Sequence, residues 1–274
     1  MLKKAIPFFV YSNLWISTGA ACMAWLYYQL ENLPIHLYLL FFLFFSTLLT
    51  YTFQRYIKLY QKEPIHGPRV EWMKQHPQLV KLFLFVGAIG TLIFLPFLSW
   101  KSMLVLPLLG LLSFLYAFKF RWNKRRTNLR DLSGIKILLI AAVWAVSCSV
   151  LPAIESGNFN LSSFSITAGF FSYIIGITIP FDIRDIKVDE AEKKTIPQLF
   201  GVPFAKIIAC SLIVFSYFIW AGNFEPDYGL MIGMLLSVVL IGLSKPNRGE
   251  LFFSFFIDGA LIIVPVLYYL LNTL

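Results

Sequence analysis

Hydrophobic runs close to twenty residues long recur along the whole chain and are separated by short polar segments. A helix rises 1.5 Å per residue, so about twenty apolar residues cross the roughly 30 Å hydrocarbon core of a bilayer. The pattern therefore predicts an all-α membrane protein with about nine spanning helices in a single domain, residues 1–274. We expect the helices at Phe8–Leu30, Ile35–Tyr56, Leu79–Leu98, Met103–Phe120, Ile135–Ile154, Ser163–Phe181, Ala205–Ala221, Tyr228–Leu243 and Leu251–Leu271.

The positions of the basic residues predict the orientation of these helices. Lys and Arg accumulate in the cytoplasmic loops of membrane proteins. With the N-terminus in the cytoplasm, every one of the 23 Lys and Arg residues except Lys101 falls on the inner side. The three main outer loops, Glu31–Pro34, Glu155–Asn160 and Asn223–Asp227, are neutral or acidic. Adding or removing one helix would break this alternation, so we expect the C-terminus outside.

The composition excludes other classes. The chain is 58% hydrophobic, 18% aromatic and only 14% charged, too little charge for the surface of a soluble domain. The net charge of +9 does not indicate a nucleic-acid partner, because the basic residues lie in loops between apolar runs. The stretch Met1–Leu30 resembles a signal peptide, but it is too long and has no convincing cleavage site, so we expect a retained helix. Cys22, Cys148 and Cys210 fall inside predicted helices without metal-ligand spacing.

The most informative polar segment follows the sixth predicted helix. Asp182, Asp185 and Asp189 are spaced i, i+3 and i+7, which predicts one helix face carrying three carboxylates at the cytoplasmic boundary. Carboxylates are the ligands that Mg²⁺ prefers, and Mg²⁺ commonly bridges them to substrate phosphates. In the alternative, an ordinary solvated loop, nearby basic residues neutralise the acids: Arg184, Lys187, Lys193 and Lys194.

The same segment resembles a known motif. Asp185 and Asp189 form a D-x-x-x-D pattern, followed by Lys194–Pro197 and then Gly201. This resembles the second signature of the UbiA-type intramembrane prenyltransferases, as do the predicted helix number and orientation. The stretch Ile137–Trp144 also looks like the corresponding part of that family. The resemblance covers nearly the whole chain, and its second motif is the specific part.

The resemblance implies a helical bundle around a central cavity that opens to the cytoplasm, in a bacterial inner membrane. The implied reaction moves a polyprenyl group from its diphosphate to a hydrophobic acceptor, aromatic or lipid. It implies Asp185 and Asp189 as catalytic residues and Asp182, Asp185 and Asp189 as ligands of Mg²⁺. The ion would stabilise the departing diphosphate.

One departure from the family concerns its first motif, N-D-x-x-D-x-x-x-D. Here Thr50, Tyr51, Gln54 and Lys58 stand at the motif positions, and no carboxylate remains. In a first hypothesis, cations replace the missing metal charge and bind the diphosphate directly. The candidates for that role are Arg55, Lys58, Lys119, Arg121, Arg184 and Lys194.

In a second hypothesis, Arg55 and Lys58 pair with Asp185 and Asp189, and the former active site is an internal ion-pair cluster. The protein would then be a non-catalytic homologue that binds a lipid or a membrane-protein partner. Asp258, about two turns inside the last predicted helix, is a further candidate for a role in the cavity, because a carboxylate at that depth is costly. A transporter is not favoured, since we see no two matching halves.

Overall fold

The computed structural model describes residues 2–59, 67–117, 120–122, 125–127, 134–187, 194–222 and 227–272. Apart from the connecting turns and loops, these residues are helical, with one short antiparallel hairpin of β1 (Phe120–Trp122) and β2 (Arg125–Thr127). The predicted fourth span was to end at Phe120, but its helix ends at Ala117. The sequence then turns strongly basic, and such residues leave the hydrocarbon region.

The helices of the bundle follow one another in chain order. They are α1 (Leu2–Tyr11), α2 (Leu14–Leu30), α3 (Leu37–Leu59), α4 (Pro68–Gln75), α5 (Pro77–Phe94), η1 (Leu95–Phe97), α6 (Trp100–Ala117), α7 (Ile135–Ala145), η3 (Val146–Val150), α8 (Leu151–Glu155), α9 (Leu161–Asp185), α10 (Ile196–Trp220), α11 (Tyr228–Leu243), η5 (Phe252–Ile257) and α12 (Asp258–Asn272). Both η3 and η5 are π-helical and interrupt longer helices.

Six helical segments among the described residues are long and apolar enough to cross a membrane. Two shorter apolar helices, Trp100–Tyr116 and Tyr228–Leu243, accompany them. The chain is thus an integral membrane protein of helical type. The count of nine spans and the cytoplasmic N-terminus stay predictions.

Two predicted helix boundaries differ from the structure for local reasons. The first span breaks at Asn13, which adopts a left-handed conformation with φ 67°, and Asn tolerates this conformation better than most residues. The seventh helix begins at Ile196 rather than Ala205, because the side chain of Gln198 accepts the backbone N–H of the N-cap residue Thr195 at its start. This early part of α10 kinks at Gly201, where φ is 79°.

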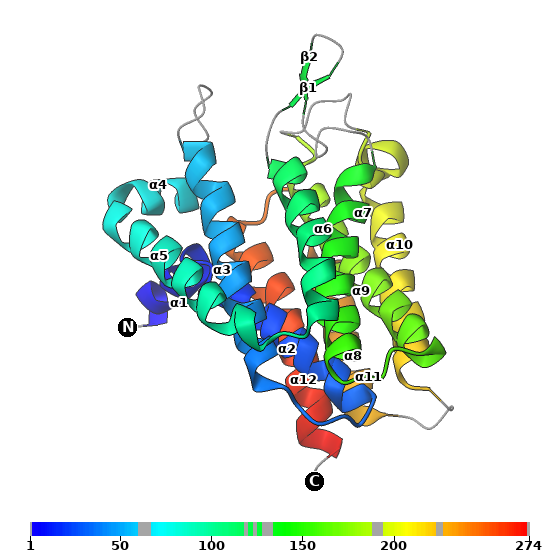
Figure 1. Cartoon of the computed structure of the whole chain (residues 1–274). Coiled ribbons are helices and arrows are strands. Elements are labelled where there is room, and N and C mark those ends of the chain that lie inside the picture. Colours follow the sequence, from blue (N-terminus) through cyan, green and yellow to red (C-terminus); the bar gives the residue numbers. More distant parts are fainter. Residues whose placement is uncertain are drawn as a thin grey trace.

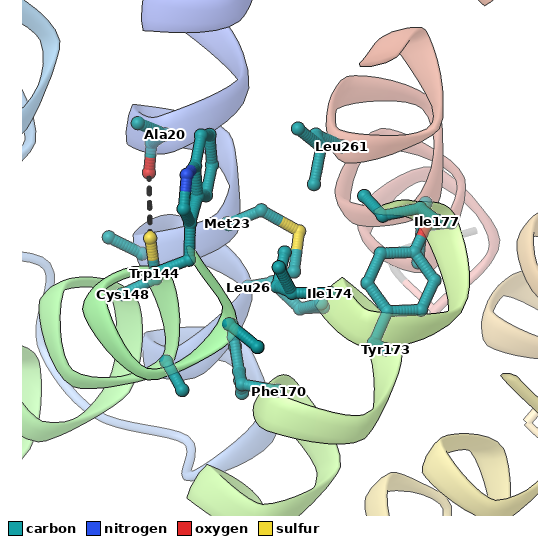
Figure 2. Packing of buried hydrophobic residues seen from close by; sticks show 14 of the residues in the cluster. Ala20, Met23, Leu26, Trp144, Cys148, Phe170, Tyr173, Ile174, Ile177 and Leu261 are labelled. Carbon is teal, nitrogen blue, oxygen red and sulfur yellow. Dashed lines mark hydrogen bonds between the residues drawn. The ribbon is translucent and has the colours of Figure 1, made fainter. Parts of the chain in front are cut away.

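The core lies where α2 meets α7 and α9. Met23 and Leu26 of α2 are fully buried and lie close to Phe170 and Ile174 of α9 and to Trp144 of α7 (Figure 2). Helix α2 also packs against α3 and α12. It therefore connects the two sides of the bundle.

Glycines allow several helix pairs to approach closely. A Cβ atom on Gly87 of α5 would lie 2.9 Å from the backbone nitrogen of Leu49 in α3. A Cβ on Gly229 of α11 would lie 2.5 Å from the carbonyl oxygen of Leu267 in α12. Helices in lipid associate through such close packing, since apolar burial alone does not favour helix–helix contact there.

The hairpin and the C-terminal ends of α3, α6 and α9 lie at one end of the bundle (Figure 1). The C-terminal end of α12 lies at the opposite end. The predicted acidic segment and the degenerate first motif are therefore brought to the same end by the fold.

Candidate functional site

Asp182 is the first of the three predicted metal ligands, and the structure joins it to a lysine. Its carboxylate accepts a hydrogen bond of 2.6 Å from the Nζ atom of Lys136, at the start of α7. The Asp182 side chain is only 2% exposed and that of Lys136 15%. A buried carboxylate needs such a partner, because burying it unpaired is very costly.

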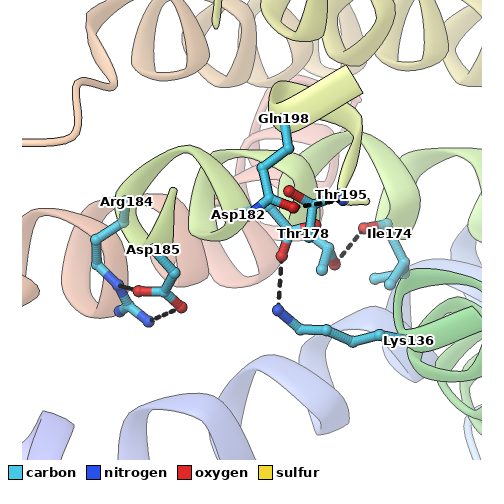
Figure 3. A network of polar contacts seen from close by, with 8 residues as sticks. All are labelled: Lys136, Ile174, Thr178, Asp182, Arg184, Asp185, Thr195 and Gln198. Carbon is cyan, nitrogen blue, oxygen red and sulfur yellow. Dashed lines mark hydrogen bonds and ion pairs between the residues drawn. The ribbon is translucent and has the colours of Figure 1, made fainter. Parts of the chain in front are cut away.

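Asp185, one turn later, is paired with its own neighbour. Arg184 donates to both carboxylate oxygens, from Nε at 2.7 Å and from Nη2 at 3.0 Å. The guanidinium also lies over the rings of Phe181 and Phe253, at 5.3 and 5.5 Å from their centroids. Figure 3 shows each carboxylate turned toward its own cation.

These pairings bear on the predicted magnesium site. Asp189 lies outside the described residues, and within the described part of the chain no group of three or more possible ligands surrounds a point suited to a metal. Asp182 and Asp185 do not fit a metal as they stand, since each carboxylate already faces a cation. The second hypothesis expected an ion pair between Arg55 and Asp185. Among the described residues, the ion pair of Asp185 is with Arg184 instead.

The tail of the acidic motif has a structural role. Thr195 is the N-cap of α10, and its backbone N–H donates to the Gln198 side chain at 2.9 Å. Pro197 occupies the first turn, where a missing N–H costs nothing. Lys194, predicted to bind substrate, is exposed and has φ 44°. Figure 3 places Thr195 and Gln198 beside Asp182.

Arg55, near the end of α3, lies over a tyrosine rather than beside an acid. Its guanidinium is 5.6 Å from the centroid of the Tyr51 ring. The Nη1 atom is buried and has no hydrogen-bond partner among the described residues. Tyr51 is fixed in turn by the indole of Trp144, which donates to its hydroxyl oxygen at 3.2 Å. Arg55 therefore offers a buried donor that no described residue satisfies.

Three arginines and three acids at this end of the bundle are joined by ion pairs and by interactions between their charges. We call them the arginine cluster: Arg55, Arg69, Arg184, Asp185, Glu250 and Asp258. Arg69, on the short helix α4, forms an ion pair of 2.8 Å with Glu250. Burial lowers the pKa of Arg69 below its ordinary value, and the charge of Glu250 opposes that shift. The charge of Asp258 interacts with those of Arg69, Arg55 and Arg184. The six ionised side chains sum to zero, so the cluster itself has no excess positive charge.

An apolar cavity of about 630 Å³ lies beside the cluster. Its walls come from α3, α6, α7 and η3, with single contributions from α2, α5 and α8. Tyr51 and Gln54, which stand at two positions of the degenerate motif, line its polar end together with Ser113 and Tyr116. Gln54 also donates a long hydrogen bond of 3.4 Å to the carbonyl oxygen of Ser113 across the gap. Tyr51 thus belongs both to the cavity wall and to the contact with Arg55.

Several predicted site residues cannot be placed. Lys119 and Asp189 lie outside the described residues, and the side chains of Lys58 and Arg121 are not described. The sequence alone did not single out Lys136, Arg69 or Glu250; Lys136 and Arg69 entered only as basic residues of the cytoplasmic side. The sequence holds little sign of these ion pairs, because the two partners of each pair are distant in the chain.

Comparison with known proteins places the fold. No family model and no curated protein matches the sequence. Among solved structures, a UbiA homologue from Archaeoglobus fulgidus bound to GPP and Mg²⁺ matches with a TM-score of 0.59 and 11% identity, over 97% of this chain and 100% of that one. A UbiA homologue from the same organism bound to DMAPP and Mg²⁺ matches with a TM-score of 0.55 and 12% identity, over 96% and 99%. The chain therefore has the UbiA-type fold.

Proposed function

We propose that this protein is a UbiA-type prenyltransferase that moves a polyprenyl group from its diphosphate to a hydrophobic acceptor, aromatic or lipid. The observation that carries the proposal is the apolar cavity that ends at Tyr51, next to the unsatisfied Nη1 of Arg55. We place the protein in a bacterial inner membrane, with this site toward the cytoplasm. The solved structures of the same fold were obtained with GPP or DMAPP and Mg²⁺.

The cavity would hold the isoprenoid tail. Its walls are mainly aliphatic and aromatic, with Leu109, Phe114 and Val143 among the lining side chains. Each methylene group moved from water into such a site contributes about 0.8 kcal/mol. A long tail therefore gains affinity along the cavity, whereas the polar diphosphate stays at the end marked by Tyr51.

Arg55 would bind the diphosphate, because a buried guanidinium donor without a partner suits a phosphate oxygen. The arginine cluster is neutral as a whole, so the diphosphate needs more positive charge than the cluster offers. Lys58, Lys119, Arg121 and Lys194 are the candidate sources. Positive charge at the departing oxygens stabilises the transition state as the allylic carbon–oxygen bond breaks.

A magnesium ion at Asp182, Asp185 and Asp189 remains part of the prediction from the family resemblance. It would supply the same positive charge at the diphosphate. For this to happen, Asp182 would have to leave Lys136, and Asp185 would have to leave Arg184. We therefore expect donor binding to depend on Arg55 more strongly than on Mg²⁺.

A second candidate function is that of a non-catalytic homologue, a lipid-binding protein or a subunit of a membrane complex. Two observations favour it: the degenerate first motif holds no carboxylate, and both described acids of the second motif are paired with cations. Such a protein would bind the prenyl lipid without releasing diphosphate.

The test uses the full-length protein in nanodiscs, with prenyl diphosphates of increasing chain length, with and without Mg²⁺. Binding and diphosphate release are measured for the wild type, for Arg55→Gln and for Arg55→Lys. We expect Arg55→Gln to weaken donor binding by about tenfold or more, as the loss of a charge-assisted hydrogen bond predicts. Lys74→Gln, which removes an exposed cation from α4, is the matched control. Binding without release would support the second candidate, and no binding of any donor would contradict both.

A further inference from the structure

Asp258 is the first residue of α12 and directly follows the π-helix η5. A π-helix shifts the side chains that follow it relative to a regular helix, and such segments are frequent at functional sites. Ionisable residues inside a membrane-spanning helix are costly and generally serve a site. The position of Asp258 therefore calls for an explanation beyond packing.

Asp258 differs from the other carboxylates of the arginine cluster. Asp185 is bound by Arg184 and Glu250 by Arg69. No hydrogen bond or ion pair joins Asp258 to a described residue, although its charge interacts with those of all three arginines. Within the described part of the cluster, it is the carboxylate left available to a ligand.

A second buried acceptor near this region also has no donor. Asn13, only 1% exposed, donates from Nδ2 to Thr52 at 3.0 Å, but its Oδ1 atom has no partner in the described part of the chain. The start of α2 packs against η5, since the indole of Trp15 donates to the carbonyl oxygen of Phe255 at 2.9 Å. Two acceptors to which no described residue donates, at the meeting point of α2 and α12, suit a ligand that carries hydroxyl hydrogens.

Tyr51 links Asp258 to the reacting end of the donor. It lines the cavity, carries Arg55 over its ring, and interacts electrostatically with Asp258. With the tail in the cavity and the diphosphate at Arg55, the first carbon of the prenyl chain would lie beside Tyr51. A carboxylate near this point can meet the acceptor as it approaches that carbon.

We propose that Asp258 is the general base that takes the proton of a hydroxyl-bearing acceptor, an alcohol or a phenol that reacts through oxygen. This deepens the proposed function and rests on it. The bond between the first prenyl carbon and the bridging oxygen breaks, and its electron pair leaves with the diphosphate. A lone pair of the acceptor oxygen forms the new carbon–oxygen bond, and the hydroxyl proton moves to the Asp258 carboxylate.

The experiment separates ionisation of the donor from capture by the acceptor. A prenyl diphosphate labelled with ¹⁸O at the bridging position exchanges that label with non-bridging positions whenever the carbon–oxygen bond breaks and re-forms. Exchange is measured together with total diphosphate release, with phenol, 1,2-dioleoylglycerol and water as acceptors. The proteins are the wild type, Asp258→Asn and Asp258→Glu, each as the full chain in nanodiscs.

In Asp258→Asn we expect diphosphate release to fall about a hundredfold or more, the usual scale of general base catalysis, while exchange of the label stays within about twofold. Asp258→Glu keeps the negative charge, so diphosphate release should fall less than in Asp258→Asn while exchange of the label again stays nearly unchanged. This variant provides the test if Asp258→Asn fails to fold. Glu71→Gln removes an exposed carboxylate from α4 and should change neither quantity. A parallel loss of exchange and release, or unchanged release, would overturn the assignment of Asp258 alone. A wild type that shows neither exchange nor release would overturn the proposed function as well.

Discussion

The Nζ atom of Lys136 in α7 lies 2.6 Å from a carboxylate oxygen of Asp182 in α9. The pair joins two helices at the end of the bundle where the acidic motif begins, and the Asp182 side chain is almost completely buried. A carboxylate expected from the sequence to bind a metal thus serves as an electrostatic link between helices. The same end of the bundle holds Arg55 and the part of the apolar cavity lined by Tyr51 and Gln54, so the charges that stabilise the fold lie near the proposed binding site.

The Lys136–Asp182 pair predicts a stability change that a metal ligand alone would not cause. Asp182→Asn or Lys136→Met should each lower the free energy of unfolding by about 3 kcal/mol, because a buried charge loses its partner. The double replacement should recover part of that loss, with a coupling of about 0.5–3 kcal/mol. Denaturation of the protein in detergent without Mg²⁺ measures these values. If Asp182→Asn is as stable as the wild type under these conditions, the pair has no structural role.

The close approach of α11 and α12 predicts opposite effects at two glycines of the same helix. Gly229→Ala should destabilise the protein by about 1–3 kcal/mol, because the new Cβ would meet the Leu267 carbonyl oxygen at 2.5 Å. Gly242→Ala is the matched control, since nothing lies within 4 Å of its Cβ position. It should be neutral or more stable by up to about 1 kcal/mol, owing to the higher helix propensity of Ala. Equal effects at both positions would contradict the packing described for α11.

The cavity predicts selectivity for the length of the donor. Gly110 lines it, and a Cβ there meets nothing within 4 Å, so Gly110→Leu should fold normally while filling part of the space. Displacing two methylene groups at about 0.8 kcal/mol each weakens binding of a long donor by about tenfold. A ten-carbon donor should be affected less than a twenty-carbon donor. Gly242→Leu on α11 is the control, and an equal loss for both donors would place the tail elsewhere.

The predicted topology is tested by single cysteines in a background without the native ones. Cysteines at Lys58, Arg125 and Lys193 should react with a membrane-impermeant thiol reagent only from the cytoplasmic side, and a cysteine at Asn158 only from the outside. The expectation follows from the distribution of the basic residues. Inside-out vesicles expose the cytoplasmic side to the reagent, and intact cells expose the outer side. Reaction of Asn158→Cys from the cytoplasm would exclude the nine-helix arrangement.

The sequence by itself determined the membrane class and most of the helices. The prediction for Tyr228–Leu243 coincides with α11, because its apolar run ends sharply at the Asp227 cap and at Ser244. Hydropathy and capping are local properties, since bilayer thickness and the unpaired backbone groups at a helix end impose them on each segment separately. The late start expected for α10 shows the limit, because Thr195, interpreted only as part of a motif, is the N-cap residue of this helix.

The tertiary structure alone decided which charges from distant parts of the chain meet. Spacing placed Asp182 and Asp185 together on a helix, but Asp182 faces Lys136, 46 residues away in the chain, and Asp185 is bound by its neighbour Arg184. The pairing of Arg69 with Glu250 likewise joins α4 to the segment before η5. The partner of an ionisable group depends on which helices pack against each other. Because that packing arises from close contacts such as those at Gly87 and Gly229, no local pattern in the sequence contains it.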